Sequence, residues 1–385
     1  MEEATTIDLN DEVREKFISA TNGYLNLCYQ CGTCTSACPW SLVRDFNVRK
    51  FLRSAQLGSE ERMNGDLWLC TTCSLCFNTC PKGVKVFDVV KGLRGIVVEK
   101  GRVPEPIRDM LMSMFRQGNP WMGDKGERAG WAEGLDVPVL SGVASRQADL
   151  LLYLCCTSCY DPRNKKVARD LAEIFKNAQV NFGILGTEES CCGDSALRLG
   201  ERELFQFLSE SNVETFKRYE IKNVVTSSPH TFHALKNEYN GLSDDFKVQH
   251  YTQFLKDLIE DGKLKFTKEL EAKVTYHDPC YLGRHNDIFE EPRKILESIP
   301  GLELIEMERN MRNSLCCGGG GGGMWMETPP EERFSILRVK EAIETGASYL
   351  ATSCPYCISM LEDGIKALEA DIKVVDVAEL VKMAM

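Results

Sequence analysis

The sequence predicts an α+β and α/β fold, with a mainly helical amino-terminal domain followed by two repeated α/β units that contain mostly parallel sheets. The 18 cysteines of the 385-residue chain form three groups, with eight in Cys28–Cys80, five in Cys155–Cys192 and five in Cys280–Cys357. Cysteines of the second group recur in the third at offsets of 124 or 125 residues. Around both of these groups, short apolar runs alternate with helical patterns.

Composition excludes several classes of protein. Cysteine makes up just under 5% of the chain, which is below the roughly 8–10% of small disulfide scaffolds. The length suffices for two or three domains that each bury a core, so disulfides are not needed for stability. With 46 Lys and Arg against 57 Asp and Glu, the net charge is −11. We therefore expect neither nucleic acid nor an anionic membrane surface as a partner.

The chain also lacks the apolar segments of a membrane protein. Its longest apolar run, Leu150–Cys156, has seven residues, whereas a bilayer span needs ~20. Its first twenty residues are acidic and contain no apolar leader. We expect a cytoplasmic protein without direct membrane insertion, where cysteines at this density indicate metal ligands or redox centres rather than disulfides.

The amino-terminal domain, residues 1–100, carries two copies of C-x2-C-x2-C-x3-C followed by proline, 42 residues apart. This spacing is typical of two-cluster ferredoxins, in which the fourth cysteine of each motif ligates the other cluster. It predicts two [4Fe-4S] clusters, one held by Cys28, Cys31, Cys34 and Cys80, the other by Cys70, Cys73, Cys76 and Cys38. A helix over about 46–57 would hold the motifs apart. Structural zinc is the alternative, although zinc sites usually use two separate C-x2-C pairs.

Beyond residue 100, the sequence predicts a connecting segment and two related units. Residues 101–148 are rich in glycine and contain Trp121 and Trp131, and we expect them to pack on a neighbouring domain rather than bind a cofactor. The units span 149–268 and 269–385. Three landmarks align them at offsets of 124 to 126 residues: Cys156 with Cys280, Cys191-Cys192-Gly193 with Cys316-Cys317-Gly318, and Ser228-Pro229 with Cys354-Pro355.

In the second unit, apolar runs predict strands and amphipathic runs predict helices. We expect strands at 273–276, 302–305, 349–352 and 372–375, and helices at about 289–298, 329–345, 355–369 and 376–384. The helix over 329–345 would begin at Pro329, with Thr328 as its cap. Such alternation gives a parallel sheet whose carboxyl edge carries the cysteines. Two units facing each other would present their cysteines across a pseudo-two-fold axis.

The second unit offers five sulfur ligands, one more than a cube needs: Cys280, Cys316, Cys317, Cys354 and Cys357. Adjacent cysteines do not easily reach separate corners of a compact cube, so the vicinal pair favours a more open cluster. The pattern C-x35-CCG-x35-C-x2-C resembles the cysteine-rich CCG domain of the heterodisulfide reductase family. The double motif before it resembles that family's small iron–sulfur subunit, and the chain is similar to both parts fused, as in the D-type subunit.

That resemblance implies a noncubane [4Fe-4S] cluster on the five cysteines. In the family this cluster ends an electron chain and can attack a disulfide, which makes Cys316 and Cys317 candidate catalytic residues. The run of six glycines from Gly318 to Gly323 would let backbone approach the cluster or an anionic substrate closely. Gly318, Gly319 and Gly320 are therefore candidate cofactor-binding residues, and a flexible linker is the alternative.

Several polar residues near these cysteines are candidates for supplying protons or charge. His277, Asp278 and His285 could exchange protons with thiolates, with His277 as the candidate catalytic residue. A buried, hydrogen-bonded structural histidine is the alternative. Arg284 and Arg312 could offset the negative charge of a cluster or could lie on the surface.

The first unit departs from the family pattern. Ser228-Pro229-His230-Thr231 stands where Cys-Pro-x-Cys belongs, so we expect no second noncubane cluster. Five cysteines remain, two of them without a counterpart in the second unit: Cys155, Cys156, Cys159, Cys191 and Cys192. We expect a further [4Fe-4S] cube drawn from this set, with His230 nearby, and inert buried thiols are the alternative.

Because only one noncubane site is complete, the sequence predicts an electron-transfer subunit of a larger redox complex rather than a complete heterodisulfide reductase. The resemblance implies a flavin-based bifurcating assembly, for example one feeding a benzoyl-CoA reductase, with a flavoprotein subunit of the heterodisulfide reductase A type as partner. No G-x-G-x-x-G follows a strand, so flavin or nicotinamide would belong to a partner. A disulfide reductase subunit and a subunit of a quinone-linked membrane complex are the alternatives.

Overall fold

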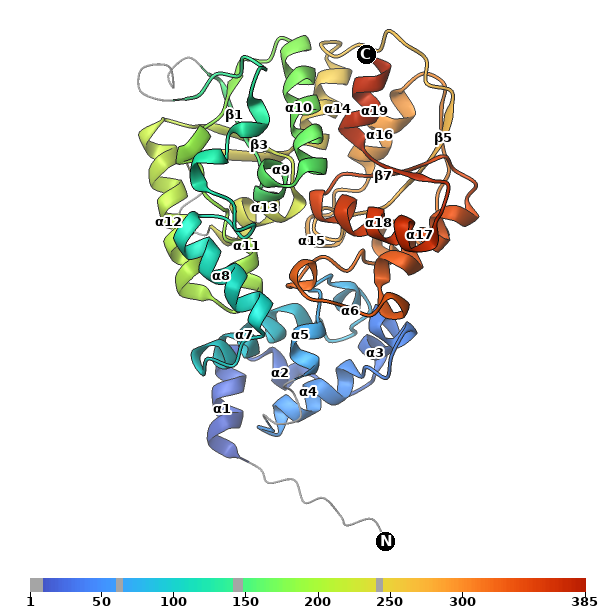
Figure 1. Cartoon of the computed structure of the whole chain (residues 1–385). Coiled ribbons are helices and arrows are strands. Elements are labelled where there is room, and N and C mark those ends of the chain that lie inside the picture. Colours follow the sequence, from blue (N-terminus) through green and yellow to red (C-terminus); the bar gives the residue numbers. More distant parts are fainter. Residues whose placement is uncertain (1–9, 60–64, 141–147, 240–244) are drawn as a thin grey trace.

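The computed structural model describes residues 10–59, 65–140, 148–239 and 245–385. Two predictions concern residues outside these ranges. They are the acidic amino terminus, at residues 1–9, and part of the connecting segment, at residues 141–147. A helical domain lies beneath two α/β units that stand side by side (Figure 1). This confirms the predicted fold class. None of the helices in the described ranges combines the length and apolar character of a membrane span.

The amino-terminal domain is a set of short helices around a small apolar core. Its helices are α1 (Asp11–Ala20), α2 (Tyr24–Leu27), α3 (Thr33–Ala37), α4 (Val48–Gln56), α5 (Asp66–Leu69), α6 (Leu75–Asn78) and α7 (Val86–Glu99). The helix predicted between the two motifs is α4, which begins after Asn47 because the Asn47 side chain accepts a hydrogen bond from the Lys50 backbone N–H. Phe51 of α4 and Val89 of α7 are buried in the core.

The segment after α7 packs on the first unit. It contains α8 (Glu105–Gln117), a helix that the sequence did not predict. Trp131 is buried in the core of the first unit, and the Trp121 ring N–H lies 3.3 Å from the Thr157 hydroxyl oxygen. Val139 forms a parallel bridge with Ile184 and so extends that unit's sheet. The domain boundaries at 100, 148 and 268 stay predictions.

The two α/β units have the same topology. The first contains β1 (Leu150–Tyr153), β2 (Phe182–Gly183), β3 (Asn223–Thr226) and β4 (Lys247–His250), with helices α9 (Cys156–Tyr160), α10 (Pro162–Asn177), α11 (Asp194–Arg198), α12 (Arg202–Arg218), α13 (Pro229–His233) and α14 (Tyr251–Glu260). The second contains β5 (Ala272–Tyr276), β6 (Leu302–Leu304), β7 (Tyr349–Thr352) and β8 (Lys373–Asp376), with helices α15 (Gly283–Asn286), α16 (Glu290–Ser298), α17 (Phe334–Glu344), α18 (Pro355–Leu368) and α19 (Val377–Ala384). The sheet orders are β2-β1-β3-β4 and β6-β5-β7-β8, and every pair of neighbouring strands is parallel. The repeat seen in the sequence is therefore a repeat of the fold.

The units pack through equivalent helices in a reciprocal way. The first long helix of one unit contacts the last helix of the other in both directions, since α10 packs on α19 and α16 packs on α14. Arg163 of α10 strengthens this contact by pairing at 2.6 Å with both Glu362 and Glu379. These contacts relate the two units by a pseudo-two-fold axis.

One predicted helix start was wrong. The helix expected from Pro329 begins at Phe334, and Pro330–Glu332 forms a separate 3₁₀ turn. Arg333 between them is extended, with φ −71° and ψ 122°. Glu332 pairs with Arg44 of the amino-terminal domain, and the Arg333 side chain donates to the Thr328 carbonyl oxygen. The pairing with Arg44 and this local bond hold the segment out of the helix despite its helix-start residues.

Candidate metal centres

The eight amino-terminal cysteines lie in two groups of four, and each group combines cysteines from both motifs. One cavity is lined by Cys28, Cys31, Cys34 and Cys80. A second is lined by Cys38, Cys70, Cys73 and Cys76. Four thiols converging on one cavity form the donor set of a [4Fe-4S] cube, so both sites fit the clusters that the spacing predicts. The assignment of ligands stays a prediction.

The two cavities differ in their contact with solvent. Cys31 of the first group is exposed, and Cys28 and Cys80 are partly exposed. In the second group, burial raises the pKa of Cys76 well above its ordinary value. Cys38, Cys70 and Cys76 are partly exposed and Cys73 is buried, so no cysteine of the second group is exposed as Cys31 is. The first site is therefore the more open of the two to the surface.

The second group is in contact with the carboxyl-terminal unit. The thiols of Cys73 and Cys316 interact directly, and this interaction raises the pKa of Cys73 well above its ordinary value. The Cys316 sulfur also lies 3.7 Å from the Thr71 hydroxyl oxygen. The glycine run covers the same motif, because a Cβ added to Gly320 would lie 2.5 Å from the Thr71 carbonyl oxygen. Glycine is thus needed there for close approach to the amino-terminal domain.

The five cysteines of the second unit come together at the carboxyl edge of its sheet. Cys280 follows β5 and Cys354 precedes α18, while Cys357 lies in the first turn of that helix. The Cys357 thiol donates to the Cys317 sulfur at 3.3 Å. Interaction with Cys316 raises the pKa of Cys280 well above its ordinary value, and burial together with Cys317 and Cys354 does the same for Cys357. The set has the five thiols that an open cluster requires.

Backbone and neighbouring thiols favour the thiolate form of the vicinal pair. The Gly318 N–H donates to the Cys316 sulfur at 3.3 Å. Hydrogen bonds from Cys316 and Cys357, together with the Gly319 N–H, hold the pKa of Cys317 well below its ordinary value. A thiolate is the form that ligates metal. The first two glycines of the run therefore face the cysteine pair.

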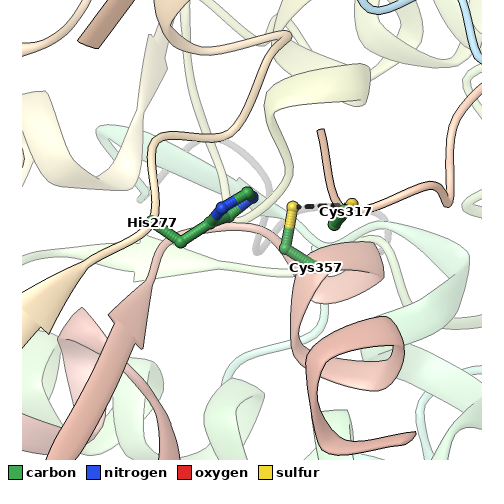
Figure 2. A group of neighbouring side chains, drawn as sticks. All are labelled: His277, Cys317 and Cys357. Atoms are coloured by element: carbon green, nitrogen blue, oxygen red, sulfur yellow. Dashed lines mark hydrogen bonds between the residues drawn. The ribbon is translucent and has the colours of Figure 1, made fainter. Parts of the chain in front are cut away.

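His277 lies beside this cysteine pair. A ring nitrogen of His277 and the sulfurs of Cys317 and Cys357 all lie within 4.8 Å of one another (Figure 2). The Arg338 Nε donates to His277 Nδ1 at 3.1 Å, so the neutral ring carries its proton on Nε2. Burial and the Arg338 charge lower the pKa of His277 well below its ordinary value. His277 is thus a neutral N–H donor, and a proton-exchange role stays a prediction.

The other polar candidates make different contacts, and not all of them lie near the cysteine sites. Asp278 pairs with Arg293 at 2.7 Å, and His285 Nε2 lies 2.9 Å from the Thr72 carbonyl oxygen. Arg284 is buried and donates to the Cys73 carbonyl oxygen at 2.7 Å. Arg312 lies on the surface and pairs with the exposed Asp287. Of the two arginines, only Arg284 is near the cysteine sites.

The first unit keeps the geometry of the second with fewer sulfurs. The thiol of Cys156 interacts with that of Cys191, as the thiol of Cys280 does with that of Cys316. The Thr231 hydroxyl donates to the Cys192 sulfur at 3.5 Å, in the position that Cys357 occupies beside Cys317. Cys155 and Cys159 add two buried thiols around α9. His230 Nδ1 lies 2.8 Å from the Asp194 carboxylate, and the His230 ring stacks on Tyr281.

Arg128 is a residue of the first-unit site to which sequence reasoning gave no role. Its guanidinium donates to the Cys156 sulfur at 3.2 Å and to the Glu189 carboxylate at 2.7 Å, with all three residues buried. Burial alone would raise the pKa of Cys156. Interaction with Cys191 and the charge of Arg128 outweigh this effect and lower the pKa of Cys156 to about 6. An isolated arginine in a glycine-rich segment carries no sequence signal for such a contact.

Comparisons with known proteins agree with this architecture. A model described as "Cysteine-rich domain" matches residues 151–236 and 274–362, and one described as "4Fe-4S dicluster domain" matches residues 24–84. Over 294 residues the chain is 37% identical to a probable iron-sulfur-binding oxidoreductase of Bacillus subtilis, covering 74% of this chain and 42% of that protein. Over 309 residues it is 38% identical to the EtfAB:quinone oxidoreductase of Syntrophomonas wolfei, covering 77% of this chain and 43% of that protein.

A third relative matches over most of its own length. This is the D-type subunit of the dihydromethanophenazine:CoB–CoM heterodisulfide reductase of Methanosarcina barkeri, 32% identical over 310 residues, which cover 79% of this chain and 74% of that relative. The fold and the cysteine sites together define an iron–sulfur protein with a dicluster domain and two cysteine-rich domains. The chain belongs to the heterodisulfide reductase D-type family. It spans less than half of the length of the Bacillus and Syntrophomonas relatives.

Proposed function

We propose that the protein passes electrons from two ferredoxin-type [4Fe-4S] clusters to a noncubane [4Fe-4S] cluster within a larger redox complex. The contact between the thiols of Cys73 and Cys316 carries this proposal. It joins the second amino-terminal cysteine group to the five-cysteine set without an intervening residue. Direct contact between the ligands of two redox centres supports rapid electron transfer between them.

The residues would hold the clusters as follows. Cys28, Cys31, Cys34 and Cys80 would hold the first cube, Cys38, Cys70, Cys73 and Cys76 the second, and Cys280, Cys316, Cys317, Cys354 and Cys357 the noncubane cluster. When bound, these clusters supply one-electron storage, and the open one also supplies iron that can capture a thiolate. The N–H groups of Gly318 and Gly319 would stabilise the negative charge on Cys316 and Cys317.

The first unit favours an electron relay over a complete disulfide reductase. Two noncubane clusters act together in the family's disulfide cleavage, and Thr231 stands where the second one would need a cysteine. We propose that the remaining set holds a further [4Fe-4S] cube, drawn from Cys155, Cys156, Cys159, Cys191 and Cys192. The charge of Arg128 on Cys156 supports a thiolate there.

The proposed setting is a flavin-based bifurcating assembly with a flavoprotein partner of the heterodisulfide reductase A type, such as one feeding a benzoyl-CoA reductase. A second candidate is delivery of electrons to a quinone-linked complex. It is favoured by the 38% identity to a relative named EtfAB:quinone oxidoreductase. A cytoplasmic location stays a prediction from the cysteine content.

The experiment uses the full chain loaded and purified without oxygen. We expect about 12 to 16 iron atoms per chain, by the count of cysteine sets. The protein is reduced with a one-electron donor and then mixed either with a soluble quinone or with a small disulfide. We expect fast, stoichiometric reoxidation by the quinone and little thiol release from the disulfide. Rapid disulfide turnover that disappears in Cys317→Ser would instead establish a reductase, and zinc without iron would overturn both.

A further inference from the structure

Arg94 of α7 is fully buried at the point where all three parts of the molecule meet. Its guanidinium donates to backbone carbonyl oxygens at 2.9 to 3.2 Å, and these acceptors belong to Leu67, Trp68, Cys70, Arg198 and Gly321. Three acceptors lie around the second cysteine motif, one in the first unit and one in the glycine run. Arg94 thus bonds to the amino-terminal domain, the first unit and the glycine run of the second unit at once.

Within the described residues, no carboxylate pairs with Arg94. Burial lowers the pKa of Arg94 to about 10, so it remains a cation at neutral pH. The two groups whose charge acts on it are Cys70 and Tyr281. Burial raises the pKa of Tyr281 well above its ordinary value, so its phenol is neutral. A buried cation without a counter-charge is costly, and Cys70 is the group that can supply this charge.

Arg284 is a second buried arginine beside this cysteine group. It donates to the carbonyl oxygens of Cys73 and Ser314, and its remaining Nη2 is buried without a hydrogen-bond partner. The carboxylate whose charge acts on Arg284 is that of Asp278, which is itself paired with Arg293. The larger influences on Arg284 are the thiols of the sites that it adjoins. Two buried guanidinium groups therefore stand beside Cys70 and Cys73.

The first cysteine group has no such buried cation among its lining residues. Arg49 and Lys82 line its cavity, and both are exposed to solvent. Water and salt screen exposed charges strongly, so their effect on a nearby redox centre is small. Cys31 at this site is exposed as well. The two cysteine groups thus differ in the number of buried cations beside them as well as in their own burial.

We propose that Arg94 is a positioning residue which, together with Arg284, holds the reduction potential of the second ferredoxin-type cluster above that of the first. This inference rests on the proposed function, because it requires a cube on each cysteine group. Reduction adds one negative charge, and a fixed buried cation stabilises that charge. One electron supplied by a one-electron donor at the exposed site then moves to the second site, with no bond made or broken and no proton moved. Electrons are thereby directed from the surface towards Cys316.

The test is a redox titration of the loaded full chain, followed by EPR. The signal of the second cluster is assigned as the one perturbed by Cys76→Ser. The ratio of reduced to oxidised second cluster is compared at the potential where the wild-type cluster is half reduced. We expect Arg94→Gln to lower this ratio at least tenfold, equivalent to a midpoint about 59 mV lower for one electron. Arg94→Lys keeps the charge and should shift the ratio less than Arg94→Gln. Arg49→Gln, the matched control at the first site, should change the second cluster's ratio less than twofold.

Two outcomes would overturn the proposal. One is a second-cluster midpoint in Arg94→Gln that matches the Arg49→Gln control at full iron content. The other is a wild-type second cluster with a lower potential than the first. Should Arg94→Gln fail to fold, Arg284→Gln tests the same effect, since Arg284 bonds only two carbonyl groups. Cluster potentials are measured without any acceptor, so a failure of the proposed electron delivery would leave this result intact.

Discussion

The two α/β units place the same side chains around their cysteine sites but fill the last ligand position differently. In both, a vicinal cysteine pair contacts a cysteine that follows the first strand. The second unit then brings Cys357 to 3.3 Å from Cys317, whereas the first brings the Thr231 hydroxyl to 3.5 Å from Cys192. The shared backbone fold sets the position of the last ligand. The side chain at that position, cysteine or threonine, determines which type of cluster the unit can hold.

The units also differ in how charge at the site is balanced. In the first unit, Arg128 reaches the Cys156 sulfur from outside the unit and pairs with Glu189. In the second, the buried Arg284 donates to the carbonyl oxygens of Cys73 and Ser314, and only its charge acts on Cys280. The vicinal pair accepts a backbone N–H in both units, from Gly193 to the Cys191 sulfur at 3.5 Å and from Gly318 to the Cys316 sulfur at 3.3 Å. The units therefore share their backbone donors and differ in whether a side-chain cation reaches a cysteine sulfur directly. The repeat has thus diverged in its electrostatics while keeping its fold.

Removing one sulfur from each unit gives the largest expected contrast. Cys317→Ser should abolish the EPR signal of the noncubane cluster in the oxidised protein and remove about four iron atoms, because Cys317 contacts two of the other ligands. The equivalent variant Cys192→Ser should leave that signal in place and remove at most the iron of the first-unit cube. Loss of the signal in both variants, or in neither, would show that the units do not differ as proposed.

Restoring the missing cysteines should make the first unit resemble the second. The double variant Ser228→Cys/Thr231→Cys puts sulfurs at the positions of Cys354 and Cys357, next to Cys192. We expect about twice the noncubane EPR signal per chain, measured by spin quantitation. Ser228→Ala/Thr231→Ala is the matched control and should leave the signal at its wild-type level. An unchanged signal in the cysteine variant, at full iron content, would mean that Arg128 or the two additional thiols dictate the cluster type.

Removing the Arg128 charge should destabilise the first unit. Arg128→Met leaves Glu189 buried without its partner, and breaking a buried pair in this way costs about 3–5 kcal/mol. Urea denaturation, followed by circular dichroism, measures the change. The double variant Arg128→Met/Glu189→Met should recover most of the loss, because no charge is then left unpaired. Equal destabilisation of the single and double variants would show that packing of Arg128, rather than its charge, supports the site.

The cysteine pattern and the repeat were open to prediction from the sequence because both depend on spacing along the chain. The parallel sheets followed, since strands that alternate with helices imply right-handed crossovers. Arg94 and Arg128 were not predicted, because a single arginine has no periodicity and its partners come from distant segments. A weak signal existed for Arg94, which interrupts the apolar face formed by Val90, Leu93 and Val97. The start of α17 failed for the same reason, as contacts with Arg44 override the local helix-start residues.

The smallest effects are expected at a pair of equivalent residues that cap the last helix of each unit, His250 before α14 and Asp376 before α19. Both are buried, with opposite consequences for their protonation. Burial lowers the pKa of His250 from 6.5 to about 3 and raises the pKa of Asp376 from 3.8 to about 7. Between pH 3 and 6.5 the unfolded chain binds more protons at His250, so this residue makes stability rise with pH. Between pH 3.8 and 7 the folded chain binds more protons at Asp376, so this residue makes stability fall with pH.

Replacing either cap by asparagine, which also caps helices, should therefore change the pH profile in opposite directions. Asp376→Asn should stabilise the protein at pH 8 relative to pH 5 by on the order of 1–2 kcal/mol, because no carboxylate is then buried in ionised form. His250→Asn should improve stability at pH 5 relative to pH 8 by a similar amount. Urea midpoints of both variants at the two pH values measure these shifts. Each variant could instead change the urea midpoint equally at pH 5 and pH 8. That result would show that the two residues only cap their helices, and that the protonation of these caps does not differ between the first and second units.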